Sequence, residues 1–253
     1  MIANPEHPPE QPKGRGSSVA FPHRFERWAR VEMADGWPGE GEEVLADNRT
    51  EVRFETARSA LTRNTSPDIA FDLSLNPYRG CEHGCSYCYA RPSHSYLSLS
   101  PGLDFEQKLI AKTNLPDLLR QELAHPRYQP LALALGTVTD VYQPIERKLG
   151  LTRQLIEVLA ACRHPFSLVT KGSAIERDIG LLAAVAQRGG VAVYVTLTTL
   201  NPVLARQLEP RAASPARRLR LIRQLSEAGI PVGVSLAPQI PFLNEDMEAC
   251  LEA

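Results

Sequence analysis

From residue 69 onward, short apolar runs alternate with longer stretches that have the periodicity of an amphipathic helix. This alternation is typical of parallel βα units, because the crossover between two parallel strands is usually a helix. Five units are too few to close an eight-stranded barrel, and cysteines replace the glycine-rich phosphate loop of a doubly wound sheet. We therefore expect an α/β fold, an open partial (β/α) barrel. Its predicted strands are Ile69–Leu75, Leu131–Leu135, Phe166–Val169, Val191–Asn201 and Pro231–Leu236.

The sequence before this pattern is different in character. Residues 1–48 are rich in Pro, Gly, Glu and Arg, and they lack any sustained periodicity. We expect them to form an irregular leader ahead of the barrel domain, residues 49–253. Phe21, Phe25 and Trp28 are the leader residues through which it would contact that domain.

Composition excludes several classes of protein. No apolar run approaches the roughly 20 residues that cross a bilayer, and the N-terminus lacks the residue order of a signal peptide. The five cysteines are an odd number for a secreted disulfide framework. A cytoplasmic protein that spans no membrane is therefore predicted. The net charge of −1 gives no support for electrostatic binding to nucleic acid.

Polar or metal-binding side chains follow every predicted strand. In parallel barrels the chemistry takes place at the carboxyl ends of the strands, so these side chains are expected to share one site. In chain order, these side chains are the clustered Cys81, Cys85 and Cys88, then Thr137, Thr139 and Asp140, then Thr170 and Lys171, then Thr196, Thr198 and Thr199, and finally Gln239.

The cluster itself is the stretch RGCEHGCSYCYARP, which contains Cys81, Cys85 and Cys88. The two other cysteines, Cys162 and Cys250, are predicted to lie on apolar helix faces as core residues. Three thiolates suit a [4Fe–4S] cluster in which one iron keeps an open position for a small molecule.

Two other readings of the cysteines stay open. A structural zinc site would need a fourth ligand, for which His83 and His94 are the candidates. A redox dithiol made of Cys85 and Cys88 would leave Cys81 without a role.

The spacing C-x3-C-x2-C, with Tyr87 just before the last cysteine, resembles the motif of the radical S-adenosylmethionine superfamily. Residues 76–244 resemble the spore photoproduct lyase group and the related DNA repair photolyase-like proteins, in CEHGCSYCYA, VTKG, LEPRAASPARR and AGIPVGVSLAP. The resemblance implies a [4Fe–4S] cluster whose open iron binds S-adenosylmethionine. It also implies reductive cleavage to methionine and a 5′-deoxyadenosyl radical, with electrons from a partner such as flavodoxin or ferredoxin.

The resemblance also implies roles for individual residues. Lys171, in VTKG, would hold the methionyl carboxylate, with a surface lysine in a turn as the alternative. Thr198 would contact the same group, with an ordinary β-branched strand residue as the alternative. Tyr87 would pack near the adenine, with Gln239 and its neighbours on the far wall of the pocket. Asp140 is a candidate acceptor for the amino group or the ribose, with capping of a loop as the alternative.

Two departures from the family pattern limit these inferences. The lyase carries a hydrogen-donating cysteine at its second strand end, where this chain has Thr137, so thymine-dimer repair is not the expected activity. Family members usually close six strands, whereas this chain shows five and then the helical stretch Asn244–Glu252. We therefore expect the sixth strand to be absent, the barrel to be C-terminally incomplete, and the edge after the fifth strand to be unpaired.

The leading hypothesis is a radical S-adenosylmethionine enzyme that abstracts hydrogen from an unknown substrate. The resemblance allows a nucleic-acid-related substrate, which the net charge does not support. The alternatives are a non-enzymatic [4Fe–4S] redox sensor or electron carrier and, third, a zinc-held binding module.

Overall fold

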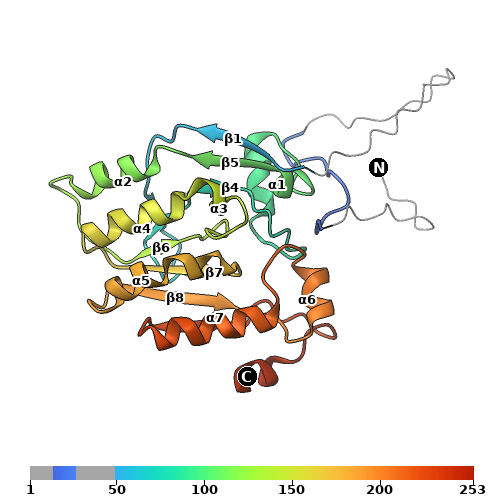
Figure 1. Cartoon of the computed structure of the whole chain (residues 1–253). Helices are drawn as coiled ribbons and strands as arrows, with labels where there is room; N and C mark the ends of the chain where they lie inside the picture. The colour runs from blue at the N-terminus through green and yellow to red at the C-terminus, as the bar shows by residue number, and fades with distance from the viewer. Residues whose placement is uncertain (1–13, 27–48) are drawn as a thin grey trace.

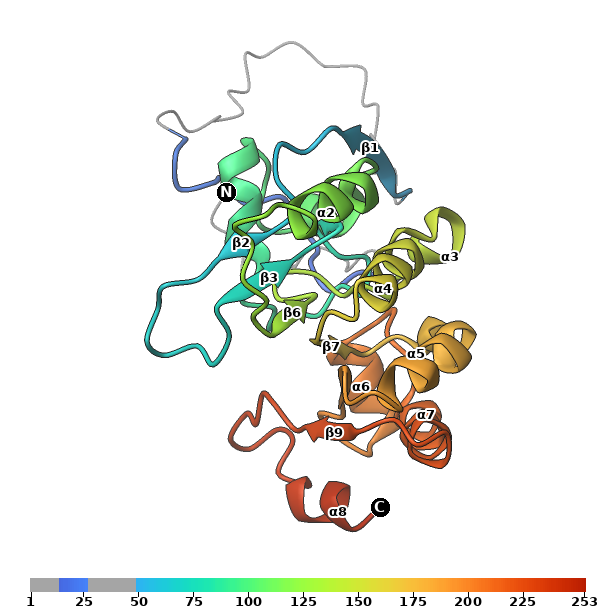
Figure 2. The ribbon, with the colours of Figure 1, turned by 90° about the vertical axis from the view of Figure 1, so that its left-hand side faces the viewer.

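A six-stranded sheet forms the centre of the computed structural model, which describes residues 14–26 and 49–253 (Figures 1 and 2). The strand order is β2-β3-β6-β7-β8-β9, in which β3 and β6 to β9 run parallel and β2 runs antiparallel to β3. The five predicted parallel strands are thus confirmed. The strands are β2 (Thr62–Arg63), β3 (Leu73–Leu75), β6 (Leu133–Leu135), β7 (Phe166–Thr170), β8 (Val191–Thr196) and β9 (Val232–Ser235).

Helices cover one face of this sheet, as Figure 2 shows, and no helix of residues 14–26 or 49–253 forms a layer on the other face. The main ones are α2 (Leu115–Leu123), α4 (Leu151–Ala161), α5 (Ile179–Ala186) and α7 (Pro215–Glu227). Alternate strand residues, such as Leu135, Leu168 and Val193, enter the core beneath these helices. The shorter helices are α1 (Asp104–Gln107), α3 (Glu146–Leu149), α6 (Pro202–Leu208) and α8 (Met247–Glu252), with 3-10 segments η1 (Arg91–Leu97) and η2 (Ser173–Asp178).

A second, three-stranded sheet lies at one end of the molecule and was not expected from the sequence (Figure 1). Its order is β1-β5-β4, with β1 at Glu51–Glu55, β5 at Lys108–Lys112 and β4 at Tyr78–Arg79. The β4 strand immediately precedes the cysteine cluster, so this sheet fixes the start of the cysteine loop.

Two expectations about the surface have different outcomes. Cys162 is exposed rather than buried, because α4 ends at Ala161 and Leu155 and Leu159 already occupy the core face. Cys250 is buried, as predicted.

Within the described residues β9 pairs only with β8, so the outer edge of β9 carries no further strand. No helix in this part of the chain is long and apolar enough to cross a bilayer.

The described piece of the leader, residues 14–26, contains turns and bends without helix or strand. Phe21 and Phe25 remain about half exposed, although the Phe25 ring lies 5.2 Å from the ring of Tyr96. Trp28 lies outside the described residues. The buried contact of the leader is made instead by Arg15, which is only 1% exposed.

Candidate cofactor site

The three clustered cysteines lie in the loop that follows β4 and line one cavity of about 410 Å³. Cys81 and Cys85 are buried and Cys88 is partly buried, and none of the three forms a disulfide. The rest of the wall comes from the carboxyl ends of β6 to β9, as the sequence predicts. These wall residues are 136–140, 169–171, Thr196, Ser235, Ala237 and Pro238.

Hydrogen bonds from neighbouring elements fix the backbone of the cysteine loop. The amide of Cys81 donates to the carbonyl of Phe105 at 2.9 Å, and Arg91 donates to the carbonyl of Cys85 at 2.8 and 3.0 Å. Arg91 is in turn paired with the fully buried carboxylate of Glu106 at 2.5 Å. The loop is therefore held in shape from outside the cavity.

Asp140 braces the strand ends against this loop. Its carboxylate accepts hydrogen bonds from the amide of Lys171 (2.7 Å), the hydroxyl of Thr170 (2.7 Å) and the amide of Tyr142 (2.8 Å), and Nδ1 of His83 lies 3.2 Å away. Burial alone would raise the pKa of Asp140, but His83 and these hydrogen bonds hold it well below its ordinary value. With its oxygens occupied by protein donors, Asp140 fits the loop-capping alternative better than a ligand role.

Lys171 brings a positive charge to the cavity. Its ammonium lies 5.6 Å above the ring of Tyr87 and has no hydrogen-bond or ion-pair partner among the described residues. Burial would lower the pKa of Lys171, yet Cys85, Glu209 and Asp140 raise it above the ordinary value. The ammonium is therefore available to an anionic group of a bound molecule.

A buried carboxylate organises the floor beneath Tyr87. Glu209 accepts hydrogen bonds from the Tyr87 hydroxyl, from the Thr198 hydroxyl at 3.1 Å and from the Arg218 guanidinium. Arg218 is 1% exposed and also donates to the carbonyl of Thr196 at 3.0 Å. Both residues lie in the stretch LEPRAASPARR, but no periodicity indicates that they pair, because Glu209 and Arg218 become neighbours only through the turn between α6 and α7.

Two predicted ligand residues are not on the cavity wall. Thr198 is buried against Glu209, because β8 ends at Thr196 and the chain turns there. Thr196 lines the cavity in its place. Gln239 is exposed and donates back to the carbonyl of Leu236.

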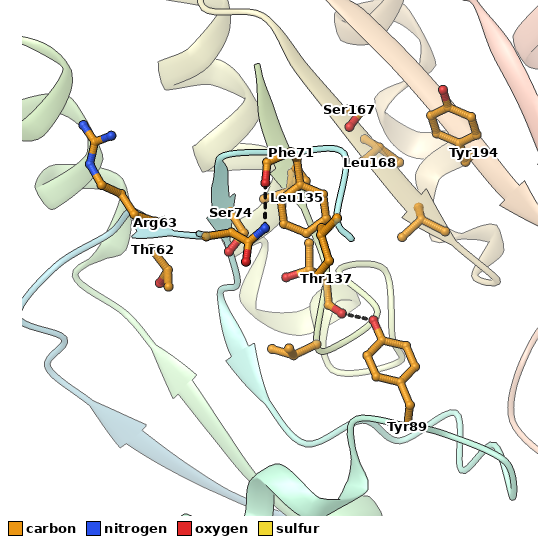
Figure 3. Close-up of a pocket in the computed structure, with 15 residues that line it drawn as sticks. Thr62, Arg63, Phe71, Ser74, Tyr89, Leu135, Thr137, Ser167, Leu168 and Tyr194 are labelled. Atoms are coloured by element: carbon orange, nitrogen blue, oxygen red, sulfur yellow. Dashed lines mark hydrogen bonds between the residues drawn. The ribbon is translucent and has the colours of Figure 1, made fainter. Parts of the chain in front are cut away.

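An adjoining cavity of about 620 Å³ lies on the helix-free face of the sheet (Figure 3). Small side chains in neighbouring strands, Ser74, Ala134 and Ser167, leave this face hollow. Aromatic residues Phe71 and Tyr194 also line the cavity, and none of the described lining residues is acidic.

Tyr89, which sequence reasoning missed, stands between the two cavities. It lines both, together with Thr137, Val138 and Val169, and its hydroxyl donates to the carbonyl of Thr137 (Figure 3). The two cavities are therefore neighbours along a shared wall. The signal available in the sequence was the position of Tyr89 directly after the last cysteine.

The cysteines fit a cluster better than a single ion. Among residues 14–26 and 49–253, no group of three His, Cys, Asp or Glu side chains is placed to hold one metal ion. Thiolates around one zinc all lie about 2.3 Å from it, whereas a cube spreads its ligands over separate corners. His94, a candidate fourth zinc ligand, has Nε2 bonded to the carbonyl of Lys108 at 3.0 Å. Burial raises the pKa of the Cys85 thiol to about 12, and a bound metal centre would favour its ionised form.

Comparison with known proteins identifies the family. Residues 75–253 match the Radical SAM superfamily. An uncharacterised protein of Mycobacterium tuberculosis is 37% identical over 238 residues, which cover 88% of this chain and 70% of that protein. An uncharacterised protein of Methanocaldococcus jannaschii is 28% identical over 169 residues, 67% of this chain and 61% of that protein.

Among solved structures, spore photoproduct lyase complexed with dinucleoside spore photoproduct superposes with a TM-score of 0.58 at 20% identity. The match covers 83% of this chain and 58% of the lyase chain, so this chain spans less than two thirds of the lyase's length. The lyase likeness is one of fold, and it agrees with the partial-barrel fold expected from the sequence. On the match of residues 75–253 and the mycobacterial relative, the chain belongs to the radical SAM superfamily.

Proposed function

We propose that this protein is a radical S-adenosylmethionine enzyme in which Cys81, Cys85 and Cys88 bind a [4Fe–4S] cluster and the 410 Å³ cavity binds S-adenosylmethionine. When bound, the two groups supply reductive cleavage of the sulfonium to methionine and a 5′-deoxyadenosyl radical, which takes hydrogen from a substrate. The observation that carries the proposal is that the three free thiols and the Lys171 ammonium face the same cavity.

The protein's own residues bind and orient. The Lys171 ammonium, lacking a protein partner in the described chain, is placed to pair with the methionyl carboxylate. Glu209 holds the Tyr87 ring beside that ammonium, and Asp140 holds the backbone of Lys171 in position. Thr198 acts through Glu209 rather than on the ligand.

We place the substrate in the adjoining 620 Å³ cavity. Because this cavity shares a wall with the first one, a substrate bound there lies next to the adenosyl group of bound S-adenosylmethionine. Aromatic walls and the absence of acidic lining residues in the described chain favour a planar group that is neutral or anionic. A nucleobase satisfies both conditions. Because Thr137 is a poor hydrogen-atom donor, thymine-dimer repair is not part of the proposal.

The remaining features of the proposal concern the setting of the reaction. A one-electron reductant such as flavodoxin or ferredoxin supplies the electron to the cluster. Free, unpaired cysteines next to an oxygen-sensitive cluster agree with a cytoplasmic location.

The test is anaerobic reconstitution with iron and sulfide, followed by electron paramagnetic resonance of the reduced protein with and without S-adenosylmethionine. We expect a cluster signal that shifts on addition, and formation of 5′-deoxyadenosine with dithionite. Cys85→Ala removes both, whereas the control Cys162→Ala, at an exposed cysteine outside the cavity, keeps both. A cluster signal that ignores S-adenosylmethionine would overturn the proposal in favour of an electron carrier or redox sensor.

A further inference from the structure

The leader segment of residues 14–16 lies against the outer side of the cysteine loop, beside α1 (Figure 1). Arg15 is 1% exposed, which is rare for a charged side chain in an irregular segment. Its guanidinium donates to the carbonyl of Glu106 at 2.8 Å and to the hydroxyl of Thr50 at 3.1 Å. That hydroxyl donates in turn to the carboxylate of Glu82, inside the cysteine loop, at 2.7 Å.

Two glycines bring the leader backbone directly onto the loop backbone. A Cβ atom at Gly16 would stand 1.7 Å from the carbonyl oxygen of Gly84, a distance that no side chain can adopt. Gly84 lies between Cys81 and Cys85 and has a φ of +67°, which favours glycine. The contact therefore depends on the absence of a side chain at Gly16.

One chain of contacts links this segment to a cysteine through Glu106. The amide of Gly16 donates to the Glu106 carboxylate at 2.9 Å, and the same carboxylate pairs with Arg91. Arg91 donates to the carbonyl of Cys85. Arg91 thus connects the leader contact to a proposed cluster ligand.

A second chain of contacts runs through Arg211, in the turn after α6. Its Nε donates to the carbonyl of Gly14 at 3.1 Å, and its guanidinium pairs with Glu82 at 3.2 Å. Its amide donates to the carbonyl of His83 at 3.2 Å. The leader and the cysteine loop are therefore tied to the same third element.

We propose that residues 14–16 form a strap that completes the cofactor site, with Arg15 and Gly16 as positioning residues that hold the Cys81–Cys85 segment in its cluster-binding shape. The inference rests on the proposed function and extends the site beyond residues 75–253, the part that matches the family. A strap of this kind keeps the loop closed over the cluster and limits access of oxygen from the outer side.

The experiment compares Arg15→Met with Arg24→Met, a matched control in the same leader segment. Arg24 contacts Tyr96 at the surface and makes none of the strap contacts. Each protein is loaded anaerobically and its iron content and resonance spectrum are recorded. The rate at which the cluster bleaches in air is then measured, beside the thermal unfolding of the cluster-free protein.

We expect Arg15→Met to bleach about 10-fold faster than the wild type, with a broadened resonance spectrum, and Arg24→Met to match the wild type. Gly16→Val, which clashes with Gly84, should behave like Arg15→Met. If Arg15→Met folds poorly, Arg15→Lys serves as the second variant, because it keeps the charge and loses the planar fork. Arg15→Lys should bleach at a rate between those of the wild type and Arg15→Met, and its cluster-free form should unfold at the wild-type temperature.

The strap proposal is overturned if Arg15→Met and Gly16→Val, or a folded Arg15→Lys, bleach at the wild-type rate and give wild-type spectra. The proposed function would remain intact in that case. Failure of the wild-type protein to load any cluster would instead remove the proposed function itself. The two failures are therefore distinguished by the wild-type sample alone.

Discussion

The two opposite walls of the cofactor cavity are built very differently. The cysteine wall is held by buried charged groups, including Glu82, Glu106 and Arg218, that come from distant parts of the chain. The far wall, formed by Ser235 at the end of β9 and by Ala237 and Pro238 after it, is half-buried or exposed and lies at the sheet edge. The side chain of Asn244 holds this wall by donating to the carbonyl of Pro238 at 2.9 Å.

The two walls suit two different tasks, holding the cluster and admitting S-adenosylmethionine. A metal cluster needs ligands in a fixed arrangement before it assembles, whereas a wall that admits and releases a small molecule benefits from low local stability. The cysteine wall therefore behaves as a preformed frame, and the far wall as the side that adjusts to the ligand.

The largest effect is expected from Arg218→Met, which leaves Glu209 buried without its cation. Breaking one partner of a buried pair costs about 3–5 kcal/mol, so we expect the unfolding free energy of the cluster-free protein to fall by that amount. Urea titration measures it. The matched control is Arg217→Met, whose pair with Glu176 is exposed and contributes at most about 1 kcal/mol. Equal losses in the two variants would show that the frame is not built on the buried pair.

Next in size is Lys171→Met, which removes the positive charge from the cavity and keeps the cysteines. A hydrogen bond to a charged group contributes about 1.5–3 kcal/mol, so affinity for S-adenosylmethionine should fall about 10- to 100-fold. Titration of the reduced protein with S-adenosylmethionine, followed by its electron paramagnetic resonance spectrum, gives that affinity. Iron content should stay at the wild-type level. Loss of the cluster itself would mean that Lys171 belongs to the frame rather than to ligand binding.

A smaller effect concerns pH and the Glu209 carboxylate. Burial would raise the pKa of Glu209, but Arg218, Lys171 and the hydrogen bonds it accepts hold it below its ordinary value of 4.5. Because the folded-state pKa is depressed, this carboxylate contributes stability fully above the unfolded-state value and loses it as the pH falls through the lower folded-state value.

The stability advantage of wild type over Glu209→Gln should therefore shrink on acidification below about pH 4.5. Urea titrations of both cluster-free proteins over that range measure it. Since Asp140 and the other carboxylates are common to both proteins, their titration cancels in the difference. An advantage that does not change with pH would contradict a depressed pKa at Glu209.

Local sequence patterns predicted one part of the cofactor site and of the sheet. The cysteine motif and VTKG are local patterns at strand ends, so Cys81, Cys85, Cys88 and Lys171 could be assigned to one end of the sheet from the strand pattern and the family resemblance. The five parallel strands followed from the alternation of apolar runs.

What could not be predicted depends on contacts between distant segments. Arg15 is buried where Glu106 and Thr50 meet it, and no periodicity marks such a residue. The three-stranded sheet was missed because β4 and β5 are short and pair antiparallel across a long excursion. Thr198 lies off the cavity wall because β8 ends at Thr196, a strand end that the run Val191–Asn201 does not mark.

The smallest effect is expected at Gln239, which the sequence placed on the far wall. Its side chain is exposed and bonds only within its own loop, to the carbonyl of Leu236. Exposed substitutions usually change free energies by no more than about 0.5 kcal/mol, so Gln239→Ala should alter affinity for S-adenosylmethionine by no more than about twofold. The same resonance titration measures it, with Lys171→Met as the reference for a true ligand contact. A tenfold loss in Gln239→Ala would show that the far wall closes onto the ligand and that Gln239 turns inward when it does.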